Sequence, residues 1–415
     1  MSQDQTRYRF TAQEVDLEVL RERAFNFRWA EQAEGVIPLT AADPDFSTAP
    51  PIRDALTRYL ARGPLSYGPA TGLPSFREAV AEDLRRGGVD ASAERVIATD
   101  GAASAMFLIA KATLRPGDEA LIFDPVDFLF ARSVSAAGAR PIRVPFTRTG
   151  GVDLDLFARL ASRPKVKLLC LCAPHNPFGR TLRAEELKVI GHIAQRRGLT
   201  IMSDEVWQKI SYERPQLHTA SLPEATKLTY TVSGFSKCFG LAGLRIGYIH
   251  SPTKEAHGRL LSASHAGDTA FGASTLSQVA AEAGLRDESG WLEAWLSHLR
   301  EARDLTCDRL SLLPGLHCER PEATYLASPY LDLTDPDTRG FNSELLTQFI
   351  LERAQVALVP GSPRFFGAGA EGLVRVCFST SLELLSEALD RIEGAWGERS
   401  AWLTERSTTP LSPKD

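Results

Sequence analysis

Cysteine, methionine and long apolar runs are all scarce in this sequence. Only six of its 415 residues are cysteines and only three are methionines. Six cysteines are too few for a disulfide framework, because folds of that kind are short and dense in cysteine. No apolar run approaches the roughly 20 residues that a membrane-spanning helix needs, and the first ten residues lack the apolar core of a signal peptide. We therefore expect a cytoplasmic protein with no membrane partner.

A basic surface is also missing. Lysine and arginine total 47 and aspartate and glutamate total 52, so the formal net charge is 47 − 52 = −5. Proteins that bind nucleic acid usually carry a basic domain or stripe, so we expect no nucleic-acid partner. The hydrophobic share of 43% and the charged share of 24% are ordinary for a globular protein. At about 100–200 residues per domain, the length predicts about two domains.

A metal site is not indicated either. Cys170 and Cys172 lie two positions apart in an apolar run at 166–172, a spacing that puts both on one face of a strand. A zinc site would need two more ligands at a familiar spacing, and only His175 is near. We expect buried core thiols and no bound metal.

Short β-branched apolar runs alternate with helical patterns through the middle of the chain. The expected strands are 95–99, 120–123, 142–145, 166–172, 199–202, 228–232 and 245–249. This alternation predicts an α/β fold in which a mostly parallel, seven-stranded sheet lies between helices. Sheets of this kind bind ligands beyond the carboxyl ends of their strands, so we look for functional residues in the turns that follow.

The two ends of the chain differ from the middle. We expect a large domain at 47–290, and a smaller α+β domain built from 1–46 together with 291–398. A capping-box pattern at Thr11–Glu14 predicts a helix that runs to about Ala30. The Ser/Thr/Pro-rich end predicts a flexible tail at 399–415.

The first candidate turn is 99–104, which follows one strand and opens an apolar helix. Small residues at Ala102 and Ala103 would let backbone N–H groups approach an anion at the start of that helix. A tight strand-to-helix turn that needs glycine would explain the same residues without a ligand, and the pattern alone does not separate the two.

Two further turns carry polar side chains. Asn176, within 174–180, is held after a strand by two prolines and a glycine, and it either donates to a ligand or satisfies its own turn. Asp204 follows the strand at 199–202. It could bind a metal or a cationic ring nitrogen, or it could cap a helix.

The most specific segment is 234–248, where Lys237 stands among small and apolar residues. Lysine is seldom buried without a reason. Loss of water around the amine lowers its pKa and makes it the nucleophile that a Schiff base requires. The apolar surroundings disfavour an ordinary surface lysine.

Together these segments resemble the class I/II aminotransferases, the fold-type I enzymes that use pyridoxal 5′-phosphate. The stretch 234–247 is similar to the lysine motif of that family, and the other turns match in the same order. The segments 66–72, 359–362 and 372–375 match as well, so the resemblance runs from Ala41 to about Trp396. It implies a homodimer that moves an amino group between a small α-amino acid and a 2-oxo acid.

The resemblance also implies roles for individual residues. Lys237 would hold the cofactor as a Schiff base and move the substrate α-proton. Asp204 would face the pyridine nitrogen, Asn176 the phenolic oxygen, and Arg375 the substrate α-carboxylate. The implied cofactor-binding residues are Ala102, Ala103, Phe128, Asn176, Asp204, Trp207, Ser236 and Arg245, with Tyr67 reaching the phosphate of the neighbouring subunit. The implied substrate-binding residues are Arg375, Ala42 and Asn176.

Three positions depart from the family pattern. Trp207 stands where many relatives have tyrosine, and Gly234 stands where many have serine or threonine, for which Ser233 could substitute. Asp127 falls where most relatives stack an aromatic ring on the cofactor, so we expect Phe128 to take that role.

Two alternative functions remain. The segments 42–46, 174–177 and 322–326 resemble the branch of the family that holds cystathionine β-lyases, which expel a β-thiol after the same proton abstraction. Arg245, retained as in aminotransferases, favours amino transfer. A ligand-sensing pyridoxal-phosphate domain of a transcription regulator is disfavoured, because only about 40 residues precede Ala42 and they leave little room for a DNA-binding module.

Overall fold

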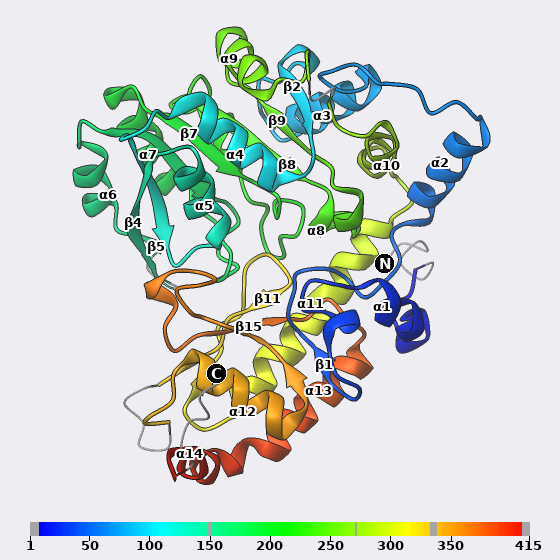
Figure 1. Ribbon diagram of the computed structural model, residues 1–415, viewed down its shortest axis with the longest axis vertical. Helices are drawn as coiled ribbons and strands as arrows, with labels where there is room; N and C mark the ends of the chain where they lie inside the picture. Colours follow the sequence, from blue (N-terminus) through cyan, green and yellow to red (C-terminus); the bar gives the residue numbers. More distant parts are fainter. Residues whose placement is uncertain (1–7, 148, 150, 270–271, 333–337, 409–415) are drawn as a thin grey trace.

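An eight-stranded sheet organises one half of the molecule, in the order β2-β9-β8-β7-β6-β3-β4-β5 (Figure 1). The computed structural model describes residues 8–147, 149, 151–269, 272–332 and 338–408. The strands of this sheet are β2 (Val96–Thr99), β3 (Glu119–Asp124), β4 (Arg140–Thr147), β5 (Gly151–Val152), β6 (Val166–Cys172), β7 (Thr200–Asp204), β8 (Thr229–Gly234) and β9 (Gly247–His250). All seven expected strands are present, and β5 is an added two-residue strand that pairs with the end of β4. It is too short to give an alternating pattern in the sequence.

The sheet is mostly parallel, as expected. The pairs β3–β4, β3–β6, β6–β7 and β7–β8 are all parallel. Only β9, in the interior of the order, runs antiparallel to both of its neighbours, and it pairs with β8 up to the register Gly234↔Gly247. The chain between those two glycines therefore leaves the sheet and returns to it at the same edge.

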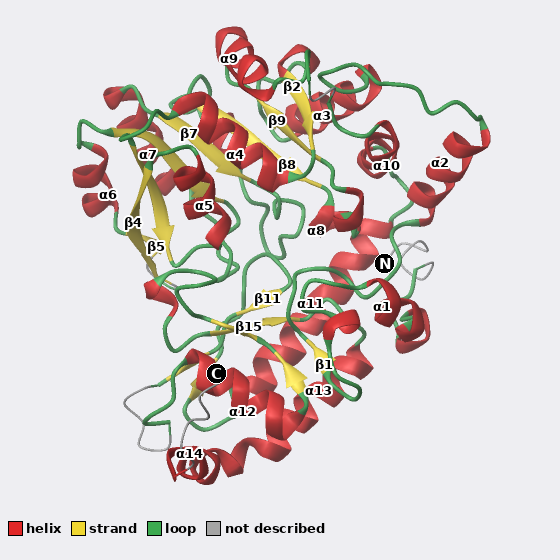
Figure 2. Cartoon of the chain, in the orientation of Figure 1, coloured by secondary structure: helices red, strands yellow, loops and turns green. Residues whose placement is uncertain are grey.

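Helices cover the sheet and bury its strands (Figure 2). β6 is buried at every position except Lys167, which is the continuous apolar pattern of a strand covered on both faces. Cys170 and Cys172 are buried in it, as expected. The helices of this half are α2 (Pro50–Ala61), α3 (Pro74–Arg86), α4 (Ala102–Thr113), α5 (Phe128–Ala136), α6 (Leu154–Ala161), α7 (Ala184–Arg197), α8 (Ser236–Phe239), α9 (Lys254–Ser264) and α10 (Thr275–Leu285).

The other half combines short strands with longer helices. The strands are β1 (Ile37–Pro38), β10 (Leu316–His317), β11 (Leu326–Ala327), β12 (Tyr330–Leu331), β13 (Val356–Ala357), β14 (Val359–Pro360) and β15 (Val374–Cys377). The helices are α1 (Leu17–Arg23), α11 (Trp291–Leu310), α12 (Ser343–Ala354), α13 (Leu382–Ala395) and α14 (Arg399–Thr408). β1 pairs in parallel with β13, so the N-terminal segment lies beside the C-terminal region. The division at 46/47 and 290/291 stays a prediction.

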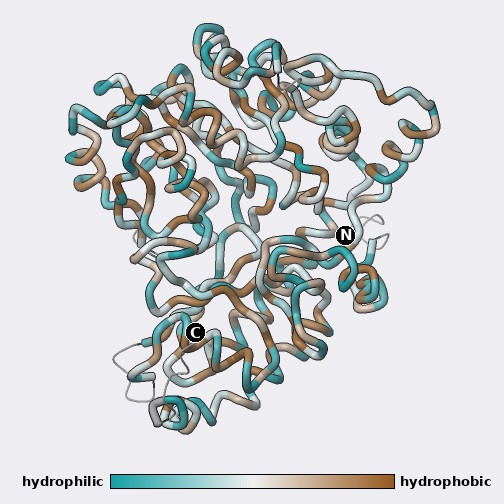
Figure 3. Tube along the Cα trace, viewed as in Figure 1, coloured by the Kyte–Doolittle hydropathy of each residue, from teal (hydrophilic) through white to brown (hydrophobic). Residues whose placement is uncertain are grey.

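Apolar segments lie toward the inside of both halves, and many outward-facing segments are polar (Figure 3). Single-turn 3-10 helices complete the connections, at Ala12–Glu14, Trp29–Glu31, Ala93–Arg95, Thr219–Ser221, Ala242–Leu244, Ala368–Ala370 and Trp396–Glu398. Over the described ranges, no helix is both long enough and apolar enough to span a membrane.

Two expectations about the chain ends are wrong. Residues 399–408 form α14 rather than a tail, and Trp402 is buried there, where its indole donates to Glu352 Oε2 at 2.8 Å. The rest of the expected tail, 409–415, lies outside the described residues. The helix expected from Thr11 to Ala30 is reduced to α1.

The N-terminal helix is short because the backbone turns away from helical geometry on both sides. Asp16, rather than Thr11, caps α1, and its side chain accepts from the Val19 N–H at 3.1 Å. Beyond α1, Asn26 and Phe27 have φ values of 66° and 65°. These are left-handed values, and a right-handed helix cannot continue through them.

Candidate active site

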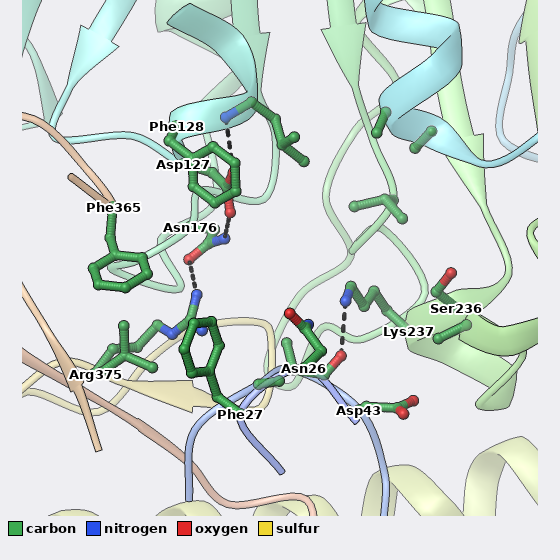
Figure 4. Close-up of a pocket in the computed structure, with 18 of the residues that line it drawn as sticks. Asn26, Phe27, Asp43, Asp127, Phe128, Asn176, Ser236, Lys237, Phe365 and Arg375 are labelled. Carbon is green, nitrogen blue, oxygen red and sulfur yellow. Dashed lines mark hydrogen bonds between the residues drawn. The ribbon is translucent and has the colours of Figure 1, made fainter. Parts of the chain in front are cut away.

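A cavity of about 830 Å³ opens at the carboxyl edge of the sheet, where the two halves meet (Figure 4). The cavity is lined by eleven of the twelve site residues expected from the sequence: Ala42, Ala102, Ala103, Phe128, Asn176, Asp204, Trp207, Ser236, Lys237, Arg245 and Arg375. The exception is Tyr67, which lies in the connection between α2 and α3 and is 91% exposed. One chain therefore brings together every predicted group except the one assigned to the partner.

Lys237 projects into this cavity from α8, directly after β8. Its Nζ donates to the Ala42 carbonyl oxygen at 2.7 Å and lies 5.5 Å from the centre of the Trp207 ring. Burial lowers the pKa of the Lys237 amine, and the negative charge of Asp43 only partly opposes that shift. The amine is therefore closer to its neutral, nucleophilic form than a lysine in water.

Asp204 ends β7 with a carboxylate that has little compensation. Its Oδ1 accepts from the Val206 N–H at 3.2 Å. Burial raises the pKa of Asp204 to about 7, and the carboxylates of Asp127 and Glu205 add to the shift. A cation placed beside Asp204 would therefore add to the charge interaction that Lys237 supplies only in part. Trp207 closes this side of the cavity and meets Tyr325 edge to face at 4.7 Å.

The start of α4 forms a second feature, suited to an anion. Gly101 enters the helix with φ 88°, and a Cβ there would come within 2.8 Å of Arg245 Nη2, so the guanidinium lies directly against the turn. A Cβ on Gly247 would lie 2.9 Å from the Ala102 nitrogen. These glycines let β9 and Arg245 approach the start of α4 closely, so that a positive charge lies beside the first backbone N–H groups of the helix, which is an anion-binding arrangement.

The hydroxyl expected to replace the one missing at Gly234 is not supplied by Ser233. The Ser233 hydroxyl donates to the Glu205 carbonyl oxygen at 3.3 Å and does not line the cavity. Ser236 does line it, at the first position of α8. The anion-binding side therefore has one serine rather than two hydroxyl side chains.

Arg375 lies on β15 at the other end of the cavity and is only 7% exposed. Its Nη1 donates to Asn176 Oδ1 at 3.3 Å and its Nη2 to the Thr40 carbonyl oxygen at 3.1 Å. Its buried Nε has no hydrogen-bond partner among the described residues. A planar guanidinium with spare donors suits a carboxylate, which it binds through two parallel hydrogen bonds.

Aromatic residues that the sequence did not point to surround this end. Phe27 and Phe365 meet edge to face at 6.3 Å, and both line the cavity with Phe128 (Figure 4). Phe27 was missed because its segment was expected to be helical, and its left-handed backbone leaves only one trace in the sequence, the neighbouring Asn26. Nothing in the sequence pointed to Phe365, since it follows the matched segment 359–362 without belonging to it.

The cofactor implied by the family resemblance fits these groups. Pyridoxal 5′-phosphate has a phosphate for the α4 start, a ring nitrogen that becomes cationic beside a carboxylate, and an aldehyde for an amine. The raised pKa of Asp204 and the lowered pKa of Lys237 are the shifts that such a molecule would relieve or use.

Comparisons with known proteins agree with this assignment. A sequence model of the family described as "Aminotransferase class I and II" matches residues 34–392. The chain is similar to an aspartate aminotransferase of Pyrococcus horikoshii, with 33% identity over 373 residues that cover 89% of this chain and 93% of the relative. It is also similar to the crystal structure of an aromatic aminotransferase from Pyrococcus horikoshii OT3, with a TM-score of 0.81 and 31% identity over 89% of this chain and 97% of that one.

A third likeness concerns the fold alone. Cystalysin from Treponema denticola has a TM-score of 0.84 over 94% of this chain and 99% of its own, but only 22% identity. The expected fold-type I architecture is thereby confirmed, while the reaction is indicated by the family match and by the relatives of higher identity. On those grounds the chain belongs to the class I and II aminotransferases.

Proposed function

We propose that this aminotransferase exchanges the amino group of a small α-amino acid with a 2-oxo acid, with pyridoxal 5′-phosphate bound at Lys237. The observation that supports this most is that Lys237, Asp204 and Arg375 line one cavity. Amino transfer needs three titratable groups: an amine of lowered pKa, a carboxylate for the ring nitrogen and a guanidinium for the substrate carboxylate.

Besides its bond to Lys237, the cofactor would be held at two points. When bound, it withdraws electrons from the substrate α-carbon and carries the amino group between the two substrates. The backbone N–H groups of Ala102 and Ala103, with Ser236 and Arg245, would bind the phosphate. Asp204 would keep the ring nitrogen protonated.

Three further side chains would orient the ring. Asn176 Nδ2 has a second hydrogen with which it would bind the phenolic oxygen. Phe128 and Trp207 would pack beside the ring. With the ring oriented in this way, the bound substrate has a defined position relative to Lys237.

Arg375 and Lys237 would divide the work on the substrate. Arg375 would bind the α-carboxylate and so fix the α-carbon relative to the lysine amine. Lys237 would then take the α-proton and return it, a task for which a lowered amine pKa is suited because it permits proton transfer near neutral pH. The Ala42 carbonyl, which accepts from Nζ at 2.7 Å, would orient the amine between these steps.

We further propose a cytoplasmic homodimer in which Tyr67 completes the partner's phosphate site. Tyr67 and the nearby Leu65 are 91% and 63% exposed in the single chain. Large exposed apolar residues on one connection favour coverage by a partner. In each chain, 47–290 would bind the cofactor and the domain of 1–46 and 291–398 would carry Arg375.

A titration of the purified protein with amino acids tests the function. Conversion of the cofactor's absorbance by an amino acid, reversed by a 2-oxo acid, is the expected result. The panel includes aromatic and acidic amino acids, because the cavity is lined by aromatic rings and by Arg132. Thiol and pyruvate release from cystathionine without amino transfer would establish β-elimination instead. Cofactor binding without conversion by any amino acid would favour a ligand-sensing role.

A further inference from the structure

We propose that Asp127 is a positioning residue for the substrate carboxylate, acting through Asn176 on Arg375. The proposal rests on the proposed function, because it concerns the guanidinium to which the α-carboxylate is assigned. Figure 4 shows the three side chains in a row, joined by hydrogen bonds and reaching from the start of α5 to β15.

Asp127 is the N-cap of α5, and each of its oxygens accepts a hydrogen bond from a different part of the chain. Oδ1 accepts from the Leu129 N–H at 3.0 Å, as a capping side chain does. Oδ2 accepts from Asn176 Nδ2, also at 3.0 Å. The capping bond fixes the carboxylate on a rigid helix end, so the second oxygen has a defined place from which to hold Asn176.

This bond determines which way the Asn176 amide faces. An asparagine side chain has one acceptor and one donor group, and a carboxylate can only accept. With Nδ2 directed to Asp127, the amide oxygen is directed to Arg375, where it accepts from Nη1 at 3.3 Å. In the reversed orientation, an amide oxygen would face the carboxylate and an NH₂ group would face the guanidinium, and both contacts would be unfavourable.

Asp127 also places a negative charge near the buried guanidinium of Arg375. Arg375 is bound by two uncharged oxygens, those of Asn176 and Thr40, and Asp127 is the carboxylate that lies beyond the first of them. Burial lowers the pKa of Arg375, and the negative charge of Asp127 is the first of the influences that oppose it. Asp127 therefore both orients the amide and stabilises the guanidinium without contacting it.

The departure from the family pattern at this position agrees with the proposal. An aromatic ring at 127 could neither cap α5 nor accept from Asn176. Here the carboxylate does both, while the ring of Phe128 lines the cavity one position later.

Two variants separate the cap from the contact to Asn176. In Asp127→Asn the remaining oxygen can still cap α5, but the NH₂ group then faces the donor of Asn176. Asp127→Ala removes both contacts. The matched control is Asp153→Ala, since Asp153 caps α6 with a bond to the Leu156 N–H at 2.9 Å and does not line the cavity.

The readout is binding of an α-methyl amino acid to the cofactor-loaded protein, followed by absorbance, because this analogue keeps the carboxylate but has no α-proton to lose. We expect Asp127→Asn and Asp127→Ala to weaken its binding at least tenfold, and to raise KM for the amino acid more than they lower kcat. Asp153→Ala should lower the melting temperature and leave the dissociation constant within twofold of wild type.

A double-variant comparison checks the route. In an Asn176→Ala background, Asp127→Asn should weaken binding of the analogue no further. Wild-type affinity in Asp127→Asn would overturn the proposal and assign Asp127 to the cap alone. An equal loss with and without Asn176 would overturn the route through that residue. If wild-type protein transfers no amino group at all, the proposed function fails, whichever way these variants behave.

Discussion

The buried carboxylate of Asp204 gives a sharp prediction for the cofactor-free protein. Replacement by asparagine removes a group whose folded-state pKa, about 7, lies well above its ordinary value of 3.8. An acid with a raised folded pKa stabilises the fold least when it is ionised, so its contribution is lost as the pH rises from about 4 through 7. Asp204→Asn should therefore make the cofactor-free protein more stable at pH 8.

The magnitude follows from the shift. About three pKa units correspond to about 4 kcal/mol over the whole titration. Between pH 5 and pH 8, linkage with these two pKa values predicts that wild type loses about 2.5 kcal/mol more than the asparagine variant. With the cofactor bound, a cation about 4 Å away would return roughly 4 kcal/mol at an effective dielectric of 20, so the advantage of the asparagine variant at pH 8 should be nearly abolished.

Urea unfolding of both proteins at pH 5, 6, 7 and 8, with and without pyridoxal 5′-phosphate, measures these differences. If the free energy of unfolding of cofactor-free wild type and of cofactor-free Asp204→Asn changes with pH in the same way, the reasoning about burial is refuted. A cofactor-loaded variant that keeps its full stability advantage over loaded wild type at pH 8 would refute the pairing of Asp204 with the ring nitrogen.

Three further predictions concern the two ends of the cavity and the second subunit. Arg375→Ala should raise KM for the amino acid at least about 30-fold in steady-state kinetics, because loss of one partner of a buried charged contact costs about 2 kcal/mol or more. Gly247→Ala should weaken cofactor binding at least tenfold in equilibrium dialysis, since its Cβ would lie 2.7 Å from the Ser233 carbonyl oxygen and 2.9 Å from the Ala102 nitrogen. The control Gly258→Ala, on α9 and outside the cavity lining, should bind the cofactor as wild type does, because its Cβ would meet open space. Tyr67→Phe should weaken cofactor binding. Mixing Tyr67→Phe subunits with Lys237→Ala subunits should raise the activity above that of Tyr67→Phe alone, because in a hybrid dimer one site has both Lys237 and the Tyr67 of the other subunit. No gain in activity on mixing would contradict a site shared between subunits.

The sheet and the cofactor end of the cavity could be predicted because their signals are local. β-branched runs mark the strands, and the polar residues that matter follow directly after them. Lys237 stood out because a charged side chain among small and apolar neighbours is unusual within a few positions of sequence. The same locality explains why Asp204 and Asn176 were found.

The substrate end could be predicted only in part, because its contacts join distant segments. Asp127 and Asn176 are 49 positions apart, and nothing near either residue indicates that they meet. Phe27 reaches the cavity through a left-handed backbone that a helical pattern concealed. The expectation of a flexible tail was wrong for a related reason: Trp402 packs against Phe341 and Phe349, which are distant in the sequence, and its indole donates to Glu352 of α12.

The antiparallel course of β9 has a consequence for how the molecule can change shape. The chain between Gly234 and Gly247 starts on β8 and ends on the adjacent strand β9. The segment that carries Ser236, Lys237 and Arg245 is therefore fixed to the sheet at both of its ends. Arg375 and Phe27 belong to the opposite half. A movement of the opposite half would thus shift Arg375 and Phe27, while the backbone that carries Ser236 and Arg245 stays fixed to the sheet.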